Sequence, residues 1–163
     1  MRAMGFETIG RRELPACERR GAVAAEVVGH PVVVVCHEAA VDIETLYGVP
    51  VGVSADLRNT SFGLSNTVLF ASYNPDYRHG DVVPLLDVYM ADKVSLKKKK
   101  LIERYKVLRR LVEHMTDEAK IRFPMSREWR TGLLRAYDEC SEIGGGLWLR
   151  VPGNPRGVLC MEV

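Results

Sequence analysis

The chain has 163 residues, of which 47% are hydrophobic and 27% charged, and its formal net charge is +2. A chain of this length can bury a core without metals or crosslinks, so we expect one domain over residues 1–163. Its longest apolar runs, residues 31–36 and 82–86, are far shorter than the roughly 20 residues of a membrane-spanning helix. This excludes a helical membrane protein and favours a cytoplasmic one.

The composition suits a protein from a hot environment, because the chain is rich in valine and charged residues and has no glutamine. Its cysteines would be reduced in most cytoplasms, but intracellular proteins of hyperthermophiles retain disulfides. The sequence therefore does not decide whether one or two disulfide bridges form. The four cysteines are Cys17, Cys36, Cys140 and Cys160. No Cys-x-x-Cys pair is present, which argues against a zinc knuckle or a thioredoxin-like motif.

Two β-branched runs come first along the chain, at residues 22–28 and 32–37. They flank Gly29-His30-Pro31, which predicts a hairpin or a sharp junction between strands. The four consecutive valines at residues 32–35 indicate a strand that is buried on both faces.

The next segment predicts a short helix and two further strands. Residues 41–47 are expected to form the helix, because a glycine and a proline follow them closely. Residues 51–55 and 67–73 predict strands around a polar loop at 58–65, and a second polar loop is expected at 74–81.

An amphipathic helix is predicted from Leu96 onward, because apolar residues recur there at steps of four and three. The residues of this stripe are Leu101, Tyr105, Leu108, Val112 and Met115. Pro124 is expected to end the helix.

A second helix is predicted to begin with Ser126 as its N-cap and to end at three glycines, residues 144–146. Its buried face would carry Trp129, Leu133, Tyr137 and Cys140. Residues 147–151 and 158–163 then predict a closing β-hairpin. The order of elements favours an α+β fold, a mostly antiparallel sheet with two helices from the C-terminal half on one face.

Positive charge is concentrated in residues 97–110, which carry eight lysines and arginines against the single acidic residue Glu103. Such a patch attracts anions, so we predict contacts with phosphate groups, with two arginines of the second helix assisting. A solvated charged surface is the alternative. The predicted phosphate-binding or nucleic-acid-binding residues are Lys97, Lys98, Lys99, Lys100, Arg104, Lys106, Arg109, Arg110, Arg127 and Arg130.

Aromatic residues lie among these charges, as in RNA sites where bases stack on aromatic rings. They are Tyr105, Phe123, Trp129 and Tyr137. Three of them, Tyr105, Trp129 and Tyr137, also fall on the apolar stripes of the two helices, so core packing is the favoured interpretation for these three.

Histidine and aspartate residues are the candidates for acid–base or metal chemistry, although turn formation explains several of them equally well. These candidates are His37, Asp56, Asp76, His79 and Asp81. His30 and His37 would lie about 23 Å apart on one extended strand, so they cannot share a metal ion. We predict no resident metal and no cofactor. Arg109 and His114 fit an Arg-x4-His spacing of some helical ribonucleases, a pattern that is common by chance.

Several enzyme classes leave no trace in the sequence. It contains no P-loop motif, no Gly-x-Gly-x-x-Gly, no Gly-x-Ser-x-Gly and no His-Glu-x-x-His. This argues against P-loop enzymes, dinucleotide sites of the usual type, α/β-hydrolases and zincins.

Spaced motifs in the first two thirds of the chain carry a family resemblance. They are Gly29-His30-Pro31, His37, Asp42-Ile43, the Gly-Val-Ser-Ala-Asp segment at 52–56, and Ala91-Asp92-Lys93. In these motifs the chain resembles archaeal domain-of-unknown-function family 371 over residues 22–105. The resemblance implies an archaeal, intracellular α+β protein and transfers no catalytic role.

Three functional hypotheses follow. The first is a non-catalytic archaeal protein that binds RNA or another phosphate-rich anion through its basic helix. The second is an enzyme that acts on a phosphorylated small molecule, with a His/Asp site and lysines holding phosphate. The third is a homo-oligomer or a subunit of a larger assembly.

Overall fold

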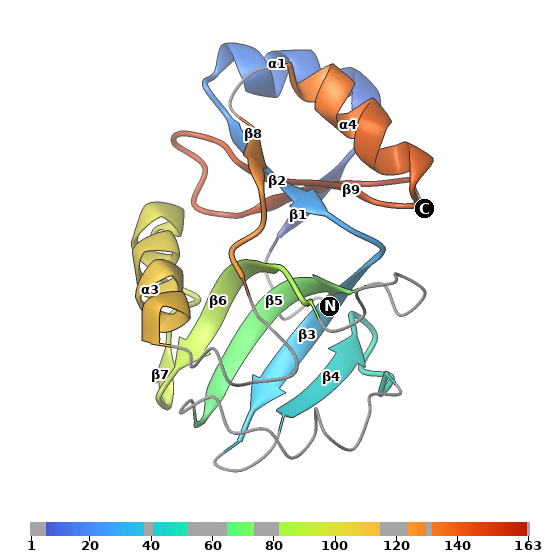
Figure 1. Cartoon of the computed structure of the whole chain (residues 1–163). Coiled ribbons are helices and arrows are strands. Elements are labelled where there is room, and N and C mark those ends of the chain that lie inside the picture. The colour runs from blue at the N-terminus through green and yellow to red at the C-terminus, as the bar shows by residue number, and fades with distance from the viewer. Residues whose placement is uncertain are drawn as a thin grey trace.

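The computed structural model describes residues 6–37, 41–51, 65–73, 82–114, 124–129 and 132–162. These residues form two five-stranded sheets that lie one above the other, with helices outside them (Figure 1). The predicted loop at 74–81, all of the loop at 58–65 but its last residue, and most of the strand predicted at 51–55 lie outside the described residues.

The first sheet joins both ends of the chain. Its strands run in the order β1-β10-β9-β2-β8. They are β1 (Glu7–Ile9), β2 (Val23–Val27), β8 (Glu128–Trp129), β9 (Gly146–Arg150) and β10 (Val158–Cys160). All neighbours are antiparallel except β1 and β10, which are parallel. A short 3-10 helix, η2 (Arg11–Glu13), leads into α1 (Leu14–Arg19), and this helix and α4 (Leu133–Glu142) cover the outer face.

The second sheet comes from one continuous stretch between β2 and β8. Its strands run in the order β4-β3-β5-β6-β7, and all its pairings are antiparallel. They are β3 (His30–Cys36), β4 (Val41–Thr45), β5 (Thr67–Tyr73), β6 (Leu85–Ala91) and β7 (Val94–Ser95). Helix α3 (Leu101–His114) packs on this sheet, where Leu108 is fully buried among strand residues.

A third cluster of buried side chains fills the space between the two sheets. Because side chains alternate along a strand, Leu147 and Leu149 of β9 face the helices while Trp148 between them faces the second sheet. Phe70 of β5 contacts both Trp148 and Tyr89 of β6 there. The two sheets therefore share one interlayer core.

The predicted α+β class is confirmed, and so are the strand at 67–73, the first amphipathic helix and the closing hairpin. Of the predicted stripe, Leu101 and Leu108 are buried and Val112 packs on the second sheet. Tyr105 is only half-buried and lies against Arg150 rather than in a core cluster, and Met115 lies outside the described residues. The single sheet of the prediction is two sheets, and each carries its own helices: α3 lies on the second sheet, whereas α4 lies on the first with α1.

The helix predicted at residues 41–47 is wrong, because this segment forms strand β4. Val41 and Ile43 are buried, whereas Asp42 between them is exposed. This period of two matches a strand, and the backbone of β4 pairs with β3 over its whole length.

The predicted start of the second helix is also wrong. Ser126 precedes strand β8, and its hydroxyl donates a short hydrogen bond to the carbonyl oxygen of Glu26. Helix α4 begins at Leu133, after Gly132 in the left-handed region (φ +69°). The Glu18 carboxylate accepts hydrogen bonds from the backbone N–H groups of Gly132 (2.5 Å) and Leu133 (3.2 Å), and so caps the helix from another segment.

Gly29 stands at a junction between sheets rather than in a hairpin. It adopts φ +78°, and the strands on either side of it, β2 and β3, belong to different sheets. Strand β3 is not buried on both faces as predicted, because Val32 and Val34 are buried while Val33 and Val35 are half-buried.

All four cysteines are free, so the disulfides left open by the sequence are not formed. No helix of the described residues is long and apolar enough to cross a membrane.

Candidate functional site

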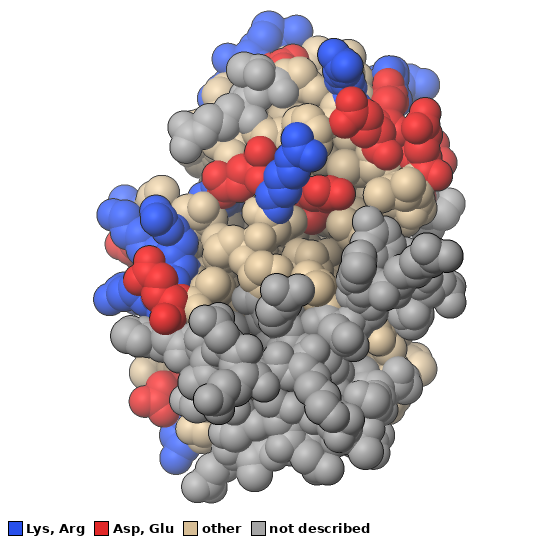
Figure 2. All heavy atoms as spheres, in the orientation of Figure 1, with Lys and Arg blue, Asp and Glu red and all other residues tan. Residues whose placement is uncertain are grey.

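The predicted basic residues gather at the start of α3 and along its outer side. Lys97 to Lys100 lie in the turn before the helix, and all four are exposed. Lys106, Arg109 and Arg110 are exposed on α3 itself. Figure 2 shows Lys and Arg side chains grouped over the position of α3, with acidic groups beside them. None of these seven residues forms an ion pair with a described carboxylate.

Two shallow pockets adjoin this basic surface. One, of about 240 Å³, is lined by Leu96, Lys99, Glu103, Lys106, Val107 and Arg110. The other, of about 350 Å³, lies between the start of α3 and the loop that joins β9 to β10, with Lys100 and Asn154 among its lining residues. Both combine apolar walls with cationic or amide groups at the rim.

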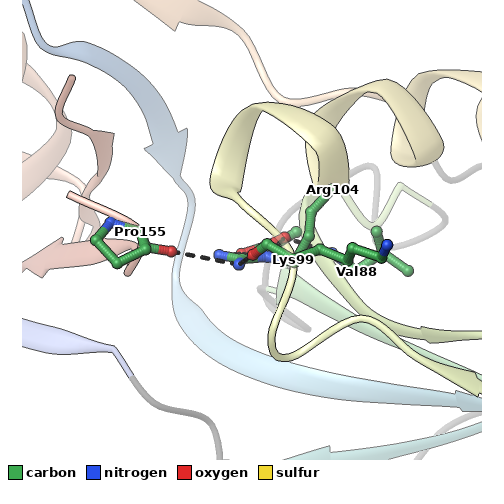
Figure 3. A network of polar contacts seen from close by, with 5 residues as sticks. Val88, Lys99, Arg104 and Pro155 are labelled. Carbon is green, nitrogen blue, oxygen red and sulfur yellow. Dashed lines mark hydrogen bonds and ion pairs between the residues drawn. The ribbon is translucent and has the colours of Figure 1, made fainter. Parts of the chain in front are cut away.

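Arg104 does not belong to this surface, so its predicted role as a phosphate ligand is wrong. Its side chain is only 5% exposed and forms a buried ion pair with Asp87 of β6, with Nε 3.1 Å from Oδ1. Its Nη1 donates to the backbone oxygens of Lys99 (2.7 Å) and Pro155 (3.3 Å) (Figure 3). Arg104 thus ties the basic turn to the β9–β10 loop.

The carboxyl group of Asp87 has a raised pKa because burial disfavours its charge. Hydrogen bonds from Arg104 and from the backbone N–H of Val88 oppose this shift. A buried charge is tolerated only when paired and hydrogen-bonded, and the two groups satisfy each other in this way. The contacts of this ion pair are therefore those of a structural interaction inside the fold.

Two further arginines stack on aromatic rings. The guanidinium of Arg127 lies 4.2 Å from the ring centroid of Trp129, and that of Arg150 lies 3.6 Å from the ring centroid of Tyr105. Arg150 also pairs with Glu128. Arg127 is exposed on the segment that leads into β8.

Tyr137 is buried in the core of the first sheet, as the sequence predicted. Trp129 packs against that core from β8 rather than from a helix. Arg130 and Phe123 lie outside the described residues.

Four of the five predicted acid–base candidates are not among the described residues. Asp56, Asp76, His79 and Asp81 lie outside the described residues, as does the side chain of His114. His37 is described, and its Nε2 lies 3.0 Å from Oδ2 of Asp42, with both side chains about half exposed. Within the described part of the chain, no group of three or more His, Cys, Asp or Glu side chains could hold a metal ion.

Sequence reasoning missed several polar atoms that are buried in and beside the interlayer core. The hydroxyls of Ser72 and Tyr89 and the indole N–H of Trp148 are buried without a hydrogen-bond partner in the part of the chain that the structure describes. In β5, Phe70 faces the interlayer core while Leu69, Ala71 and Tyr73 face the other core, which places Ser72 on the same side as Phe70. Buried polar groups are normally satisfied, so each of these requires an explanation.

No family model and no curated protein matches the chain. Solved structures do match. A mycobacterial DNA ligase D complexed with ATP and MES has a TM-score of 0.58 and 14% identity, over 86% of this chain and 54% of that one. The ligase domain from M. tuberculosis LigD matches with a TM-score of 0.54 and 14% identity, over 85% of this chain and 52% of that one. The structure named Pmar-Lig_PreS3 matches with a TM-score of 0.50 and 11% identity, over 96% of this chain and 46% of that one.

The likeness establishes the fold. This chain spans about half the length of each of these proteins. The prediction of a non-catalytic protein that binds RNA through a basic helix is contradicted, because the structural neighbours are ligase domains. Net charge and charge clustering report on anionic partners but carry no information about fold, which is why the sequence misled here.

Proposed function

We propose that this chain is a nucleotidyltransferase, which binds a nucleoside triphosphate and transfers its nucleotidyl group to an acceptor. The observation that carries this proposal is the arrangement of the two sheets, which resembles, over 86% of the chain, a ligase solved with ATP. A nucleoside triphosphate is also a phosphorylated small molecule, the substrate class of the second hypothesis from the sequence.

In the proposed reaction an oxygen of the acceptor attacks the α-phosphorus, the bond between this phosphorus and the bridging oxygen breaks, and pyrophosphate leaves. Catalysis of phosphoryl chemistry depends on positioning and on cations that balance developing negative charge. Such cations are abundant at the start of α3. In this proposal the phosphate groups of the nucleotide or of the acceptor contact Lys97, Lys98, Lys99, Lys100, Lys106, Arg109, Arg110, Arg127 and Arg130.

The proposal does not require a covalent intermediate on any described lysine. A lysine amine acts as a nucleophile only when its pKa is lowered, by burial or by a neighbouring cation. All six lysines of the described residues are exposed. Lys120 lies outside the described residues. The assay below separates direct transfer from transfer through the protein.

The test is to incubate the protein with nucleoside triphosphates labelled at the α- or the γ-phosphate, with magnesium and an oligonucleotide acceptor. We expect label from the α-phosphate, and none from the γ-phosphate, on the acceptor or on the protein, with an equal amount of pyrophosphate released. If no α-label is transferred and no nucleotide binds at millimolar concentration, the proposed function is wrong.

The role of the basic turn has its own test in the same assay. Replacing Lys97 to Lys100 together with alanine should weaken acceptor or nucleotide binding and flatten its dependence on salt, because fewer counterions are released. Replacing Arg11, Arg12, Arg19 and Arg20 together with alanine is the control with the same change of charge, since these arginines are exposed on the side of the first sheet that carries α1. Equal salt dependence in the quadruple variant and the parent would exclude the turn as a phosphate contact.

A further inference from the structure

The pocket between the start of α3 and the β9–β10 loop has an aliphatic wall that is open to solvent. Its volume is about 350 Å³, and the residues that line it are Lys100, Leu101, Ile102, Gly153, Asn154 and Pro155. Ile102 is 54% exposed, which is unusual for a large hydrophobic residue of this surface. These described lining residues include no aromatic ring, so the pocket lacks the stacking platform on which nucleic-acid bases bind.

The two sides of this pocket are tied to each other. Nη1 of Arg104 donates hydrogen bonds to the backbone oxygens of Lys99, before the helix, and of Pro155, in the loop (Figure 3). Within the loop, the Asn154 side chain accepts a hydrogen bond of 3.0 Å from the backbone N–H of Arg156. Because these contacts exist in the free protein, little conformational freedom is lost when the pocket is filled, which favours binding.

Positive charge surrounds the pocket on both sides. Lys97 to Lys100 are exposed beside it, and none of them pairs with a described carboxylate. Arg156 is exposed in the loop opposite. An occupant complementary to this pocket therefore has an aliphatic side chain for its wall and carboxylates for its rim.

The end of α4 carries an aliphatic side chain of this kind. Ile143 is the C-cap residue of the helix and is 51% exposed, and it directly follows the exposed Glu142. No basic residue stands in the last turn of α4, and Glu142 pairs with no described cation. Figure 2 shows acidic side chains grouped over this end of α4, on the opposite side of the view from α3.

We propose that a second copy of this chain docks the end of its α4 on the pocket, with Ile143 against Ile102 and Pro155 and with Glu142 facing the lysines. The contact joins unlike surfaces, because the start of α3 and the end of α4 lie on opposite sides of one molecule (Figure 1). Such a head-to-tail contact produces chains or rings rather than a symmetric dimer. Its small size makes the association weak. The inference goes beyond the proposed function and does not depend on it.

Analytical ultracentrifugation of the full chain, from micromolar to millimolar concentration, tests the contact. The average mass should rise with concentration beyond that of a dimer, and added salt should lower it, because the charges are exposed. Ile102→Asp and Ile143→Ser should each weaken the association by about tenfold or more, since each removes the apolar anchor from one side. Val49→Ser is the matched control, because Val49 is 57% exposed in the turn after β4, and it should associate like the parent.

Mixing the two weakened variants is the sharper test. The end of α4 is intact in Ile102→Asp, and the pocket is intact in Ile143→Ser. The mixture should therefore form a one-to-one complex at concentrations where neither variant associates alone. This complex should stop at two copies, because the pocket and the α4 end that remain free are both altered. Recovery in the mixture also excludes misfolding as the reason for the weakened association.

Two results would overturn the inference. One is a parent that stays monomeric at millimolar concentration, and the other is a mixture that associates no more than each variant does alone. A parent that forms a closed dimer unaffected by Ile143→Ser overturns it as well, because the contact then lies elsewhere. Transfer of the α-label is measured separately, so none of these results decides the proposed function.

Discussion

Arg104 shows how one residue of a basic cluster can differ from all its neighbours. The sequence places it among lysines and arginines of the same charge, yet only Arg104 falls on the inner side of α3, three residues from Leu101 and four from Leu108. Helical periodicity could have singled it out, because it shares a face with the apolar stripe. Its partner Asp87 could not be inferred, since the pairing depends on how α3 packs on β6.

Removing the Arg104 side chain should destabilise the protein strongly. Arg104→Ala leaves Asp87 buried without its partner, which costs about 3–5 kcal/mol in the free energy of unfolding. Denaturant unfolding of the variant and of Arg109→Ala measures this, because Arg109 is exposed on the same helix and its loss should cost less than about 0.5 kcal/mol. Similar losses of unfolding free energy in both variants would mean that the buried ion pair stabilises the fold no more than an exposed arginine does.

The buried thiols make the protein sensitive to alkali. Burial raises the pKa of Cys36 and of Cys160 to about 12 and that of Cys140 to about 11, from an ordinary value of 9.0. Below pH 9 the thiols are protonated in both states. Between pH 9 and these raised values the unfolded chain loses protons that the folded chain retains, so stability falls as the pH rises.

Cys36→Ala should therefore lower the overall stability but flatten its decline between pH 9 and 11. Urea unfolding at each pH measures the slope. Cys17→Ala is the comparison and should flatten the decline less, because burial raises the pKa of this half-buried thiol without bringing it to the value of Cys36. An unchanged slope in Cys36→Ala would show that this thiol ionises in the folded protein as readily as in the unfolded chain.

At the scale of elements, the sequence predicted best where packing and local pattern agree. Helix α3 and the closing hairpin are local features, and both formed as expected. The helix predicted at residues 41–47 is wrong because seven residues hold too few turns to distinguish a helix from an alternating strand. The segment forms a strand because its backbone pairs with β3. The N-cap predicted at Ser126 is wrong because the residue that caps α4, Glu18, lies far away in the sequence.

This long-range cap can be tested directly. Glu18→Ala removes the acceptor for the first backbone N–H groups of α4 and should lower the free energy of unfolding by about 0.5–2 kcal/mol. Thermal unfolding measures the change. Glu142→Gln, at the other end of α4, is the control and should leave the midpoint unchanged or slightly higher, because a negative charge there opposes the helix dipole. Equal midpoints for Glu18→Ala and the parent would show that solvent replaces the cap fully.

For the whole molecule, the sequence supported the α+β class but not the division into two sheets. The division depends on pairings between distant segments, such as β2 with β9 and β1 with β10, and no local pattern reports them. The same holds for the interlayer residues Phe70, Tyr89 and Trp148. Each has the apolar character of an ordinary core residue, and only the assembled sheets bring them together. The basic turn, which is contiguous in sequence, was the part of the candidate site that the sequence could predict.

The shared interlayer core leads to a prediction about cooperativity. Because Trp148 and Phe70 join the two sheets, both sheets should unfold in one transition, as expected for one domain over residues 1–163. Far-ultraviolet circular dichroism and the fluorescence of Trp148, measured in a Trp129→Phe variant, should give the same midpoint in urea. Two separate midpoints would indicate that the sheets are independent units.

The path of the chain also bears on how the protein is made. All strands of the second sheet, and α3 on it, have been synthesised once residue 114 leaves the ribosome, so this sheet can form early from neighbouring segments. Strand β2 has no such opportunity. Its partners β8 and β9 emerge some hundred residues later, and until then its backbone lacks the strands that will pair with it. The nascent first sheet is therefore the half of the molecule most dependent on timely translation or on protection by a chaperone.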